Sequence, residues 1–455
     1  MKKIFLIGLF AFFFTVTFSQ TPVLTASQLA WQNMEYYWFV HFGPNTFTDK
    51  EWGLGNETED AFNPANLDCR QWCKIAKAAG AKGIIVTAKH HDGFCLWPTK
   101  YSTHTVKQSK WKNGKGDVLK ELSQACKEYG LKFGVYLSPW DRNHPKYGTP
   151  EYNDVYVGMM EEIFKNYSPI WELWWDGANG EGPNGKKQVY DWTRFKETVR
   201  RLSPNTVVFS DVGPDIRWVG NERGIAGTTN WNLLNTDGFQ AGKDAPPTDT
   251  LNRGNFNGQH WIPAECDVSI RPGWFYHKEE DEKVKTPQQL FNIYLKSVGR
   301  GANMLLNVPA DRNGLITSYD SAAVISFKKL RDESFKDNLL KNSMLISSPD
   351  KNKKNPHTSN SAISILLKKP VELNCVVLKE KIESGQNIAQ ATLVLSEHGM
   401  EKKKIDITTI GHKRIITFDK TEADEVSLII HLTKQTPKLY PIEGYLIDES
   451  LIEKN

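Results

Sequence analysis

The feature that most constrains the fold is an alternation of short apolar segments with amphipathic helical patterns along residues 38–335. The apolar segments are too short for helices and resemble strands that a parallel sheet buries on both faces. We predict strands at residues 38–42, 83–87, 132–137, 171–175, 206–210, 260–264 and 303–308, and helices at 67–79, 117–129, 150–166, 188–202, 287–298 and 317–335. An eighth strand is expected in the Gly-, Asn- and Pro-rich residues 211–285. This alternation predicts a closed (β/α)8 TIM-like barrel.

The character of the chain changes after residue 337. All 15 tryptophans precede this point. A polar stretch at residues 347–361 then leads into short alternating segments at 362–367, 373–378, 391–395, 404–409, 413–418 and 425–431. Segments of this kind, separated by turns, are typical of a β-sandwich. We therefore predict a catalytic barrel over residues 21–337 and a C-terminal β-sandwich over residues 338–455, which has a structural or substrate-flanking role.

Residues 1–20 have the pattern of a secretory signal peptide. Lys2 and Lys3 precede an apolar run from Ile4 to Phe18, and the small Ser19 follows it. An uncleaved anchor is the alternative, but the run is short for a membrane span. No cysteine follows the run, so a lipid anchor is not expected. We predict a mature chain without a membrane span that is exported to the periplasm, with secretion from the cell as the alternative.

Charge and cysteine content exclude several classes of protein. A net charge of +4 over 455 residues is too weak to indicate a nucleic-acid partner. The six cysteines form no CxxC pair and no evenly spaced framework, so a disulfide scaffold is not indicated. Cys69 and Cys73 lie one turn apart on a predicted helix, where we expect buried free thiols rather than a disulfide or a metal pair.

Polar and aromatic side chains follow the ends of the predicted strands, where a barrel of this kind places its active site. They are His41, Glu51 and Trp52, His90 and His91, Tyr136, Asp176, and Asp211 with Glu222. The faces of tryptophan rings stack on sugars, and a carboxylate at the mouth of a barrel can attack or stabilise an electron-poor carbon. The abundance of tryptophan and tyrosine also favours a carbohydrate ligand.

Each of these groups has a simpler structural interpretation. Asp176 precedes a glycine and would be an ordinary turn residue, and Asp211 would cap a strand. His90 and His91 could bind a metal ion. However, adjacent residues of an extended segment point in opposite directions, and no further spacing completes a ligand set, so we predict no metal. By the same alternation, one of Trp174 and Trp175 faces the barrel mouth, and the other packs against a helix.

The same residues carry a resemblance to a known family. The motifs are His41-Phe42-Gly43, Glu51-Trp52, Ala88-Lys89-His90-His91-Asp92-Gly93-Phe94, Tyr136-Leu137-Ser138 and Trp174-Trp175-Asp176-Gly177. In order and spacing this series resembles the α-L-fucosidases of glycoside hydrolase family 29, over about residues 30–335. The resemblance implies a retaining, exo-acting enzyme with a (β/α)8 domain and a β-sandwich. It also implies a fucosylated oligosaccharide as substrate, and no metal or organic cofactor.

The resemblance also implies roles for single residues. Asp176 matches the nucleophile, Trp274 resembles the aromatic platform for the sugar, and the positions that bind fucose correspond to His41, Glu51, Trp52, His90, His91 and Tyr136. The segment Trp218-Val219-Gly220-Asn221-Glu222 resembles the branch that prefers α-1,3/1,4-linked fucose, and it makes Glu222 the acid/base. Glu265 is the competitor for that role and is otherwise expected to bind substrate. Alternatives are a non-catalytic fucose-binding protein, a fucosidase of broader linkage specificity, and a metal-dependent barrel hydrolase that acts through His90 and His91.

Overall fold

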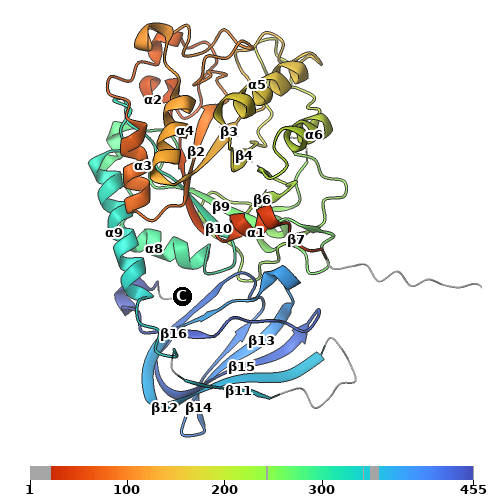
Figure 1. Ribbon diagram of the computed structural model, residues 1–455, viewed down its shortest axis with the longest axis vertical. Coiled ribbons are helices and arrows are strands. Elements are labelled where there is room, and N and C mark those ends of the chain that lie inside the picture. The colour runs from red at the N-terminus through yellow and green to blue at the C-terminus, as the bar shows by residue number, and fades with distance from the viewer. Residues whose placement is uncertain (1–21, 242–243, 342, 349–357, 454–455) are drawn as a thin grey trace, which may run out of the picture.

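The computed structural model describes residues 22–241, 244–341, 343–348 and 358–453. A barrel ringed by helices lies above a C-terminal β-domain (Figure 1). The predicted signal peptide lies outside the described residues, as does much of the polar stretch at 347–361. Within the described ranges, no helix is both long and apolar enough to cross a membrane.

The upper domain is a closed barrel of eight parallel strands, which confirms the predicted fold. Its strands are β1 (Tyr36–Val40), β2 (Gly83–Lys89), β3 (Lys132–Leu137), β4 (Glu172–Trp174), β5 (Val207–Ser210), β6 (Ile216–Trp218), β9 (Ala264–Ser269) and β10 (Asn303–Asn307). They pair in this order, and β10 closes the barrel on β1. Their carboxyl ends therefore meet at one face, as the predicted site requires.

Two barrel strands differ from the prediction. The eighth strand is β6, which has only three residues. The strand predicted at residues 260–264 is wrong in position, because His260–Trp261 (β8) pairs with Leu233–Leu234 (β7) outside the barrel, and the barrel strand β9 begins at Ala264. β9 has no continuous apolar run, since Glu265, Asp267 and Ser269 alternate with small or apolar residues along it. A search for apolar strands therefore misses it.

The six predicted helices are present, each within a few residues of its predicted ends. They are α3 (Cys69–Ala78), α4 (Val118–Tyr129), α5 (Tyr152–Tyr167), α6 (Trp192–Leu202), α8 (Pro287–Lys296) and α9 (Ser318–Ser334). The described chain also forms α1 (Ala26–Gln32), α2 (Pro44–Thr48) and α7 (Thr248–Arg253). The ends of α4 follow from its sequence: the side chain of Asp117 accepts a hydrogen bond from the backbone N–H of Lys120, and Gly130 ends the helix at φ 69°.

Aromatic residues fill both sides of the barrel wall. Trp174 points inward and stacks on Phe209, with ring centroids 4.0 Å apart. Trp175 points outward and packs on Trp192 and Phe195 of α6, at 5.3 and 6.3 Å. The prediction that the two adjacent tryptophans point to opposite sides of the strand is thus confirmed. All six cysteines are buried and free, as was predicted for Cys69 and Cys73.

No helix separates β5 from β6, and β6 is followed by a long segment that we call the excursion, residues 219–263. Its described part holds β7, α7 and β8. The buried guanidinium of Arg217 organises it, because Arg217 donates hydrogen bonds to the carbonyl oxygens of Leu251, Ile262 and Trp231 and to Oδ1 of Asn230. A single side chain of β6 thereby fixes backbone groups from three places along the excursion.

The C-terminal domain is antiparallel, which confirms its all-β prediction. Its strands are β11 (Met344–Ser348), β12 (Thr358–Leu378), β13 (Ile388–Glu397), β14 (Met400–Ile407), β15 (Arg414–Thr433) and β16 (Glu443–Tyr445). They form one sheet in the order β11-β12-β15-β13-β14, with β16 paired to β12. The segments predicted separately at 362–367 and 373–378 are joined in β12, and those at 413–418 and 425–431 are joined in β15. Both long strands curve visibly in Figure 1, and their pairing register shifts near Leu366 and Leu373.

This sheet contacts the excursion directly. Gln386 donates a hydrogen bond from Nε2 to the carbonyl oxygen of Asn230 at 2.8 Å and accepts one from the backbone N–H of Asn232 at 2.7 Å. Thr409 accepts a hydrogen bond from the backbone N–H of Asn230, and Arg414 donates one to the carbonyl oxygen of Thr228. The C-terminal domain therefore supports the segment that follows Glu222 in the chain.

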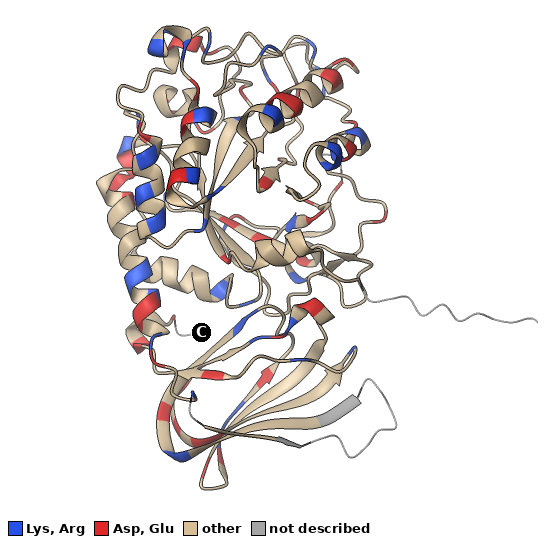
Figure 2. Cartoon of the chain, in the orientation of Figure 1, with Lys and Arg blue, Asp and Glu red and all other residues tan. Residues whose placement is uncertain are grey.

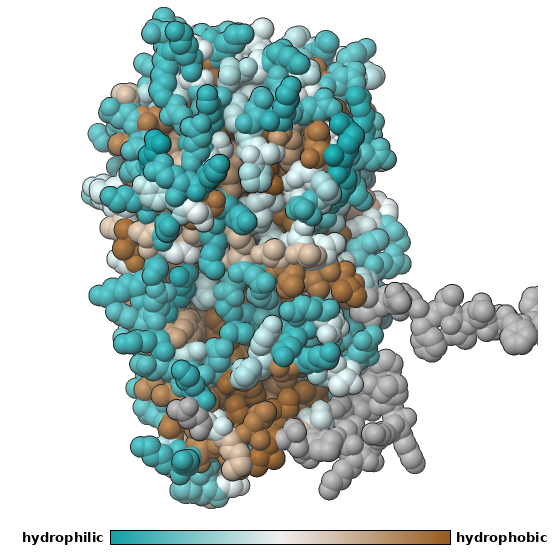
Figure 3. All heavy atoms as spheres, in the orientation of Figure 1, coloured by the Kyte–Doolittle hydropathy of each residue, from teal (hydrophilic) through white to brown (hydrophobic). Residues whose placement is uncertain are grey.

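The visible surface is of mixed charge. Figure 2 shows Lys and Arg interspersed with Asp and Glu on the helices around the barrel, without a face of one sign in this view. Figure 3 shows an apolar patch over the C-terminal sheet, where β11 carries the exposed residues Met344, Leu345 and Ile346. The distribution of charge agrees with the weak net charge of the chain.

Candidate active site

A cavity of about 210 Å³ lies at the carboxyl ends of the barrel strands. Sites for drug-sized ligands usually measure about 300 to 1,000 Å³, so this cavity suits a smaller ligand. The predicted site residues line it, except Asp211 and Glu265. The lining consists of Phe39, His41, Glu51, Trp52, His90, His91, Tyr136, Trp174, Asp176, Ala178, Glu222, Asp267 and Trp274.

Asp176 follows β4 and is held by two donors. The hydroxyl of Tyr136 donates to Oδ2 at 3.0 Å, and the backbone N–H of Ala178 donates to Oδ1 at 2.7 Å. Burial and the charge of Asp176 raise the pKa of Tyr136 well above its ordinary value, so this hydroxyl keeps its proton. The carboxylate therefore has a fixed orientation at the cavity wall.

A second aspartate, Asp211, packs against Gly177, the residue that follows Asp176. A Cβ at Gly177 would lie 2.0 Å from Oδ2 of Asp211, so only glycine allows this close approach. Burial and the charge of Asp176 raise the pKa of Asp211 to about 6. The simple interpretation of Asp211 as a strand cap thus overlooks its electrostatic coupling to Asp176.

The three histidines are neutral hydrogen-bonding groups. Burial lowers the pKa of His41 to about 3, that of His91 to about 4, and that of His90 well below its ordinary value. Neutral imidazole has one donor nitrogen and one acceptor nitrogen. These residues can therefore exchange hydrogen bonds with ligand hydroxyls without carrying a charge.

The partners of His41 assign its tautomer. Asn307 donates from Nδ2 to the carbonyl oxygen of Trp274 at 2.8 Å, which leaves its Oδ1 as the acceptor that faces Nδ1 of His41 at 2.9 Å. Nδ1 must then carry the proton, and Nε2 is an acceptor.

His91 has the same tautomer by a parallel argument. The hydroxyl of Ser138 donates to the carbonyl oxygen of Trp140 at 2.9 Å, so Nδ1 of His91 donates to that hydroxyl oxygen at 2.8 Å. Nε2 is then an acceptor 3.9 Å from Oδ2 of Asp176. A ligand hydroxyl placed beside Asp176 can donate to Nε2 of His91.

Glu51 joins two loops that border the cavity. Its Oε2 accepts a hydrogen bond from the backbone N–H of Trp274 at 2.7 Å, and its Oε1 accepts one from the N–H of Phe275 at 3.1 Å. The ring of Trp274 lies 5.1 Å from that of His41. Trp52 stands at the rim and makes edge contacts with His91 and Trp140. Residues of the loops after β1 and β9 thus form the aromatic wall of the cavity.

Glu222 lies just beyond β6 and is exposed at the cavity. Nε1 of Trp274 donates to its Oε2 at 3.3 Å. Asp267, which the sequence analysis missed, also lines the cavity and accepts a hydrogen bond from Nε1 of Trp218 at 2.9 Å. Burial and the charges of Glu222 and Glu265 raise the pKa of Asp267 well above its ordinary value. The alternation of polar residues along β9 was the signal that could have revealed it.

Glu265 is not where a substrate-binding residue would be. It is fully buried inside the barrel, where it accepts hydrogen bonds from Nε1 of Trp174, at 2.8 Å, and from the hydroxyl of Tyr37. Burial raises its pKa and that of the neighbouring Glu172. The alternation along β9 points its side chain into the interior, so Glu265 supports Trp174 from within the barrel and does not line the cavity.

Across the described ranges, no three His, Cys, Asp or Glu side chains are grouped so as to hold a metal ion.

Comparisons with known proteins agree with this geometry. A sequence model of the family described as alpha-L-fucosidase matches residues 7–327. Alpha-L-fucosidase 1 of Arabidopsis thaliana is 39% identical over 449 residues, which cover 93% of this chain and 88% of that protein. The crystal structure of a glycoside hydrolase 29 family member from an unknown rumen bacterium matches with a TM-score of 0.87 and 42% identity, over 94% of this chain and 78% of that one.

A Ruminococcus gnavus glycoside hydrolase 29 fucosidase, solved in complex with fucose, matches with a TM-score of 0.86 and 29% identity, over 96% of this chain and 97% of that one. The family match covers most of the barrel domain, including the segments that supply the cavity. The chain therefore belongs to the α-L-fucosidases, glycoside hydrolase family 29.

Proposed function

We propose that this α-L-fucosidase is an exo-acting, retaining enzyme that releases terminal α-1,3/1,4-linked L-fucose from oligosaccharides or glycoconjugates. The observation that carries the proposal is that Asp176 and Glu222 line one small cavity together with aromatic rings and neutral imidazoles. A cavity of this size suits a single sugar ring, which supports exo action. Two carboxyl groups in one site are what glycoside hydrolysis requires, and the resemblance of the motifs to family 29 supports the retaining course.

The first step transfers fucose to the enzyme. A carboxylate oxygen of Asp176 attacks the anomeric carbon, the bond to the leaving oxygen breaks, and Glu222 gives its proton to that oxygen. Asp176 must be ionised and Glu222 protonated at this point. Tyr136 and Ala178 orient the attacking carboxylate through the hydrogen bonds described above.

The second step releases fucose. Glu222, now ionised, removes a proton from water, and the water oxygen attacks the anomeric carbon from the face opposite Asp176. The bond to Asp176 breaks, so the carboxylate is restored and Glu222 again holds a proton. Two inversions at one carbon retain its configuration.

The binding groups fit a sugar with several hydroxyls. Nε2 of His41 and Nε2 of His91 accept hydrogen bonds from hydroxyl groups, and the latter lies beside the nucleophile. The ring of Trp274 supplies an apolar surface for the methyl face of fucose. Phe39 and Trp174 continue that surface toward the barrel interior.

Glu222 is a better acid/base than Glu265 on geometric grounds. Glu222 is exposed at the cavity, whereas Glu265 is fully buried and occupied by Tyr37 and Trp174. The Trp218-to-Glu222 segment, which resembles the branch specific for α-1,3/1,4 linkages, supports the proposed linkage.

A non-catalytic fucose-binding protein is the second candidate, because aromatic rings and imidazoles alone suffice to hold a sugar. The presence of both carboxyl groups at the cavity favours hydrolysis.

One experiment tests both the linkage and the stereochemistry. The purified chain is incubated with α-1,2-, α-1,3- and α-1,4-fucosylated trisaccharides, and the anomer released first is identified by proton NMR before mutarotation. We expect α-fucose, released faster from the 1,3 and 1,4 linkages. β-Fucose as first product would contradict retention, equal rates would indicate broader specificity, and binding without release would favour the non-catalytic candidate.

A further inference from the structure

His277 bridges two carboxylates that belong to another loop. Its Nδ1 lies 2.7 Å from Oδ1 of Asp49, and its Nε2 lies 2.7 Å from Oε1 of Glu51. An ionised carboxylate only accepts hydrogen bonds, and neutral imidazole has one N–H. Both contacts are therefore hydrogen bonds only when His277 carries a proton on each nitrogen. The geometry specifies a doubly protonated, positively charged ring.

The charged ring of His277 contacts Glu51, and Glu51 contacts the loop that forms one wall of the cavity. The same carboxylate accepts hydrogen bonds from the backbone N–H groups of Trp274 and Phe275. The indole N–H of Trp274 in turn contacts Glu222 at 3.3 Å. A continuous set of contacts thus leads from His277 to the aromatic wall and to the acid/base.

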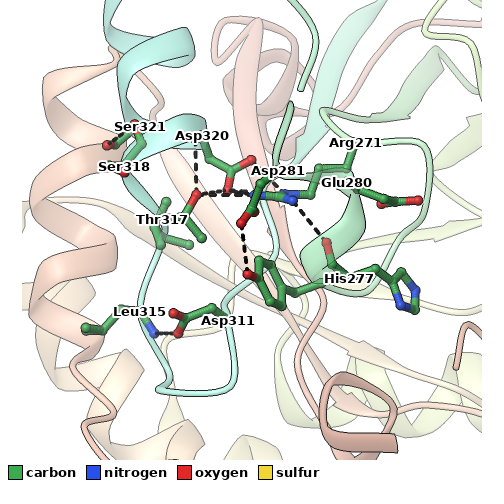
Figure 4. Close-up of polar contacts among 12 residues, drawn as sticks. Arg271, His277, Glu280, Asp281, Asp311, Leu315, Thr317, Ser318, Asp320 and Ser321 are labelled. Carbon is green, nitrogen blue, oxygen red and sulfur yellow. Dashed lines mark hydrogen bonds and ion pairs between the residues drawn. The ribbon is translucent and has the colours of Figure 1, made fainter. Parts of the chain in front are cut away.

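The backbone of His277 is anchored independently of its ring. Figure 4 shows Arg271 among Asp281, Asp320 and Thr317, with the imidazole of His277 on the side away from this cluster. Arg271 donates to Asp320 at 2.7 Å, to Asp281 at 2.9 Å, and to the carbonyl oxygen of His277 at 3.4 Å. Loss of the ring therefore leaves the base of the loop fixed and removes the contacts with Asp49 and Glu51.

Two further charged side chains, Arg312 and Glu280, contact residues close to His277. Arg312 lies 3.9 Å from Oδ1 of Asp49 and shares that carboxylate. Glu280 accepts a hydrogen bond from the backbone N–H of Gly273 on the same loop. Burial lowers the pKa of His277, but its hydrogen bonds to Asp49 and Glu51 outweigh this effect and raise it above the ordinary value.

We infer that His277 is a positioning residue of the fucose site, which as an imidazolium holds Glu51 and the Trp274 loop in the geometry that binds the sugar. The inference rests on the proposed function of that site. Since the folded-state pKa is raised, the bridge is complete below the ordinary histidine pKa and is lost as the pH rises through the folded-state pKa. Affinity for fucose should weaken on the alkaline side, whereas the chemistry at Asp176 should be less affected.

The test compares the full chain with His277→Gln, which has a single amide donor for the two carboxylates. The control is His398→Gln, which removes another histidine paired to a carboxylate, at 3.0 Å from Asp424 in the C-terminal domain. We expect KM to rise at alkaline pH in the wild type and in the control. In His277→Gln, KM should be about tenfold higher at neutral pH, as for one lost charge-assisted hydrogen bond, and should lack the alkaline rise. A wild-type KM profile in His277→Gln would overturn the inference.

Two further measurements keep the inference testable if the first variant does not fold. If His277→Gln unfolds, Asp49→Asn removes one of the two carboxylates and should shift the alkaline rise of KM to lower pH. Nitrogen NMR of the histidine rings should show both nitrogens of His277 protonated below the ordinary histidine pKa of about 6.5, and a neutral ring there would overturn the inference whatever the activity. If the proposed function is wrong, the wild-type chain will release no fucose. The NMR spectrum and the affinity for L-fucose measured by calorimetry would still report on His277.

Discussion

Asp176 and Glu222 lie on two different kinds of scaffold within one barrel. Asp176 follows a strand flanked by β3 and β5 and leads to helix α6, and two short hydrogen bonds hold its carboxylate. Glu222 lies near the start of the excursion, after a strand that no helix separates from β5, and accepts one long hydrogen bond from Trp274. The regular half of the barrel carries the proposed nucleophile, and the irregular half carries the proposed acid/base.

The difference follows from what each group has to do. A nucleophile must meet the anomeric carbon of one sugar in one geometry, so a rigid strand end serves it best. A general acid must reach the leaving oxygen, whose surroundings change with the substrate. Loops on a rigid barrel can vary in this way without loss of the fold.

The largest effect is expected at the rigid position. Asp176→Gly removes the attacking carboxylate, so we expect kcat to fall by about 10⁴-fold or more on every fucoside. Added azide should restore turnover of an activated aryl fucoside by direct attack and give fucosyl azide of inverted configuration. Measurement of kcat and of the product anomer by NMR checks both points, and an azide product of retained configuration would exclude Asp176 as the nucleophile.

A smaller effect that depends on the substrate is expected at the irregular position. Glu222→Ala removes the proton donor, so kcat on a fucosylated trisaccharide should fall by about 10² to 10³-fold. An aryl fucoside with a good leaving group needs less protonation and should lose less. The measurement is the loss of kcat on the trisaccharide divided by the loss of kcat on the aryl fucoside. Equal rates on the trisaccharide before and after the substitution would instead assign the acid/base role to another residue.

Asp211→Asn tests how tightly the nucleophile side is packed. The pKa of Asp211 is raised to about 6, so above that pH the folded chain carries a charge that burial and Asp176 disfavour. The neutral amide should raise the free energy of unfolding at pH 7 to 8 by at most about 3 kcal/mol. Below pH 4 the gain should vanish, because the carboxyl is then protonated in both the folded and the unfolded state.

Thermal unfolding at pH 4 and at pH 7.5 measures this difference. Asp249→Asn is the control, because Asp249 is an exposed residue paired only with Arg253 at 3.6 Å. An equal melting temperature for Asp211→Asn and the wild type at pH 7.5 would show that the site tolerates the charge without cost.

The smallest effect concerns the single contact that orients the acid/base. Trp274→Phe keeps an aromatic wall but removes the N–H that donates to Glu222 at 3.3 Å. We expect kcat/KM on the trisaccharide to fall about three- to tenfold, with a smaller change on an aryl fucoside. Steady-state kinetics with both substrates checks this, and Trp52→Phe at the cavity rim is a matched control. Equal losses on both substrates would show that the indole acts on the sugar and not on Glu222.

The same contrast explains what could be predicted from the sequence. Regular strands with apolar alternation reveal Asp176 and even the opposite directions of Trp174 and Trp175. No helix separates β6 from β5, so the alternation of strands and helices does not reveal β6, and β9 is concealed by its polar residues. Asp267 was therefore missed, and Glu265 was assigned to the wrong environment. The bridge from His277 to Asp49 joins residues 228 positions apart, and no local pattern encodes such a contact.

The hydrogen bonds from Gln386, Thr409 and Arg414 to residues 228–232 have a consequence for how such a chain can evolve. The barrel half that carries Asp176 depends on its own helices, whereas the segment that leads away from Glu222 depends on partners from the C-terminal sheet. A recombination event that exchanged the sheet alone would leave the proposed nucleophile in place and remove the support of the proposed acid/base. Inheritance of the two domains as one unit thus preserves both carboxyl groups of the site.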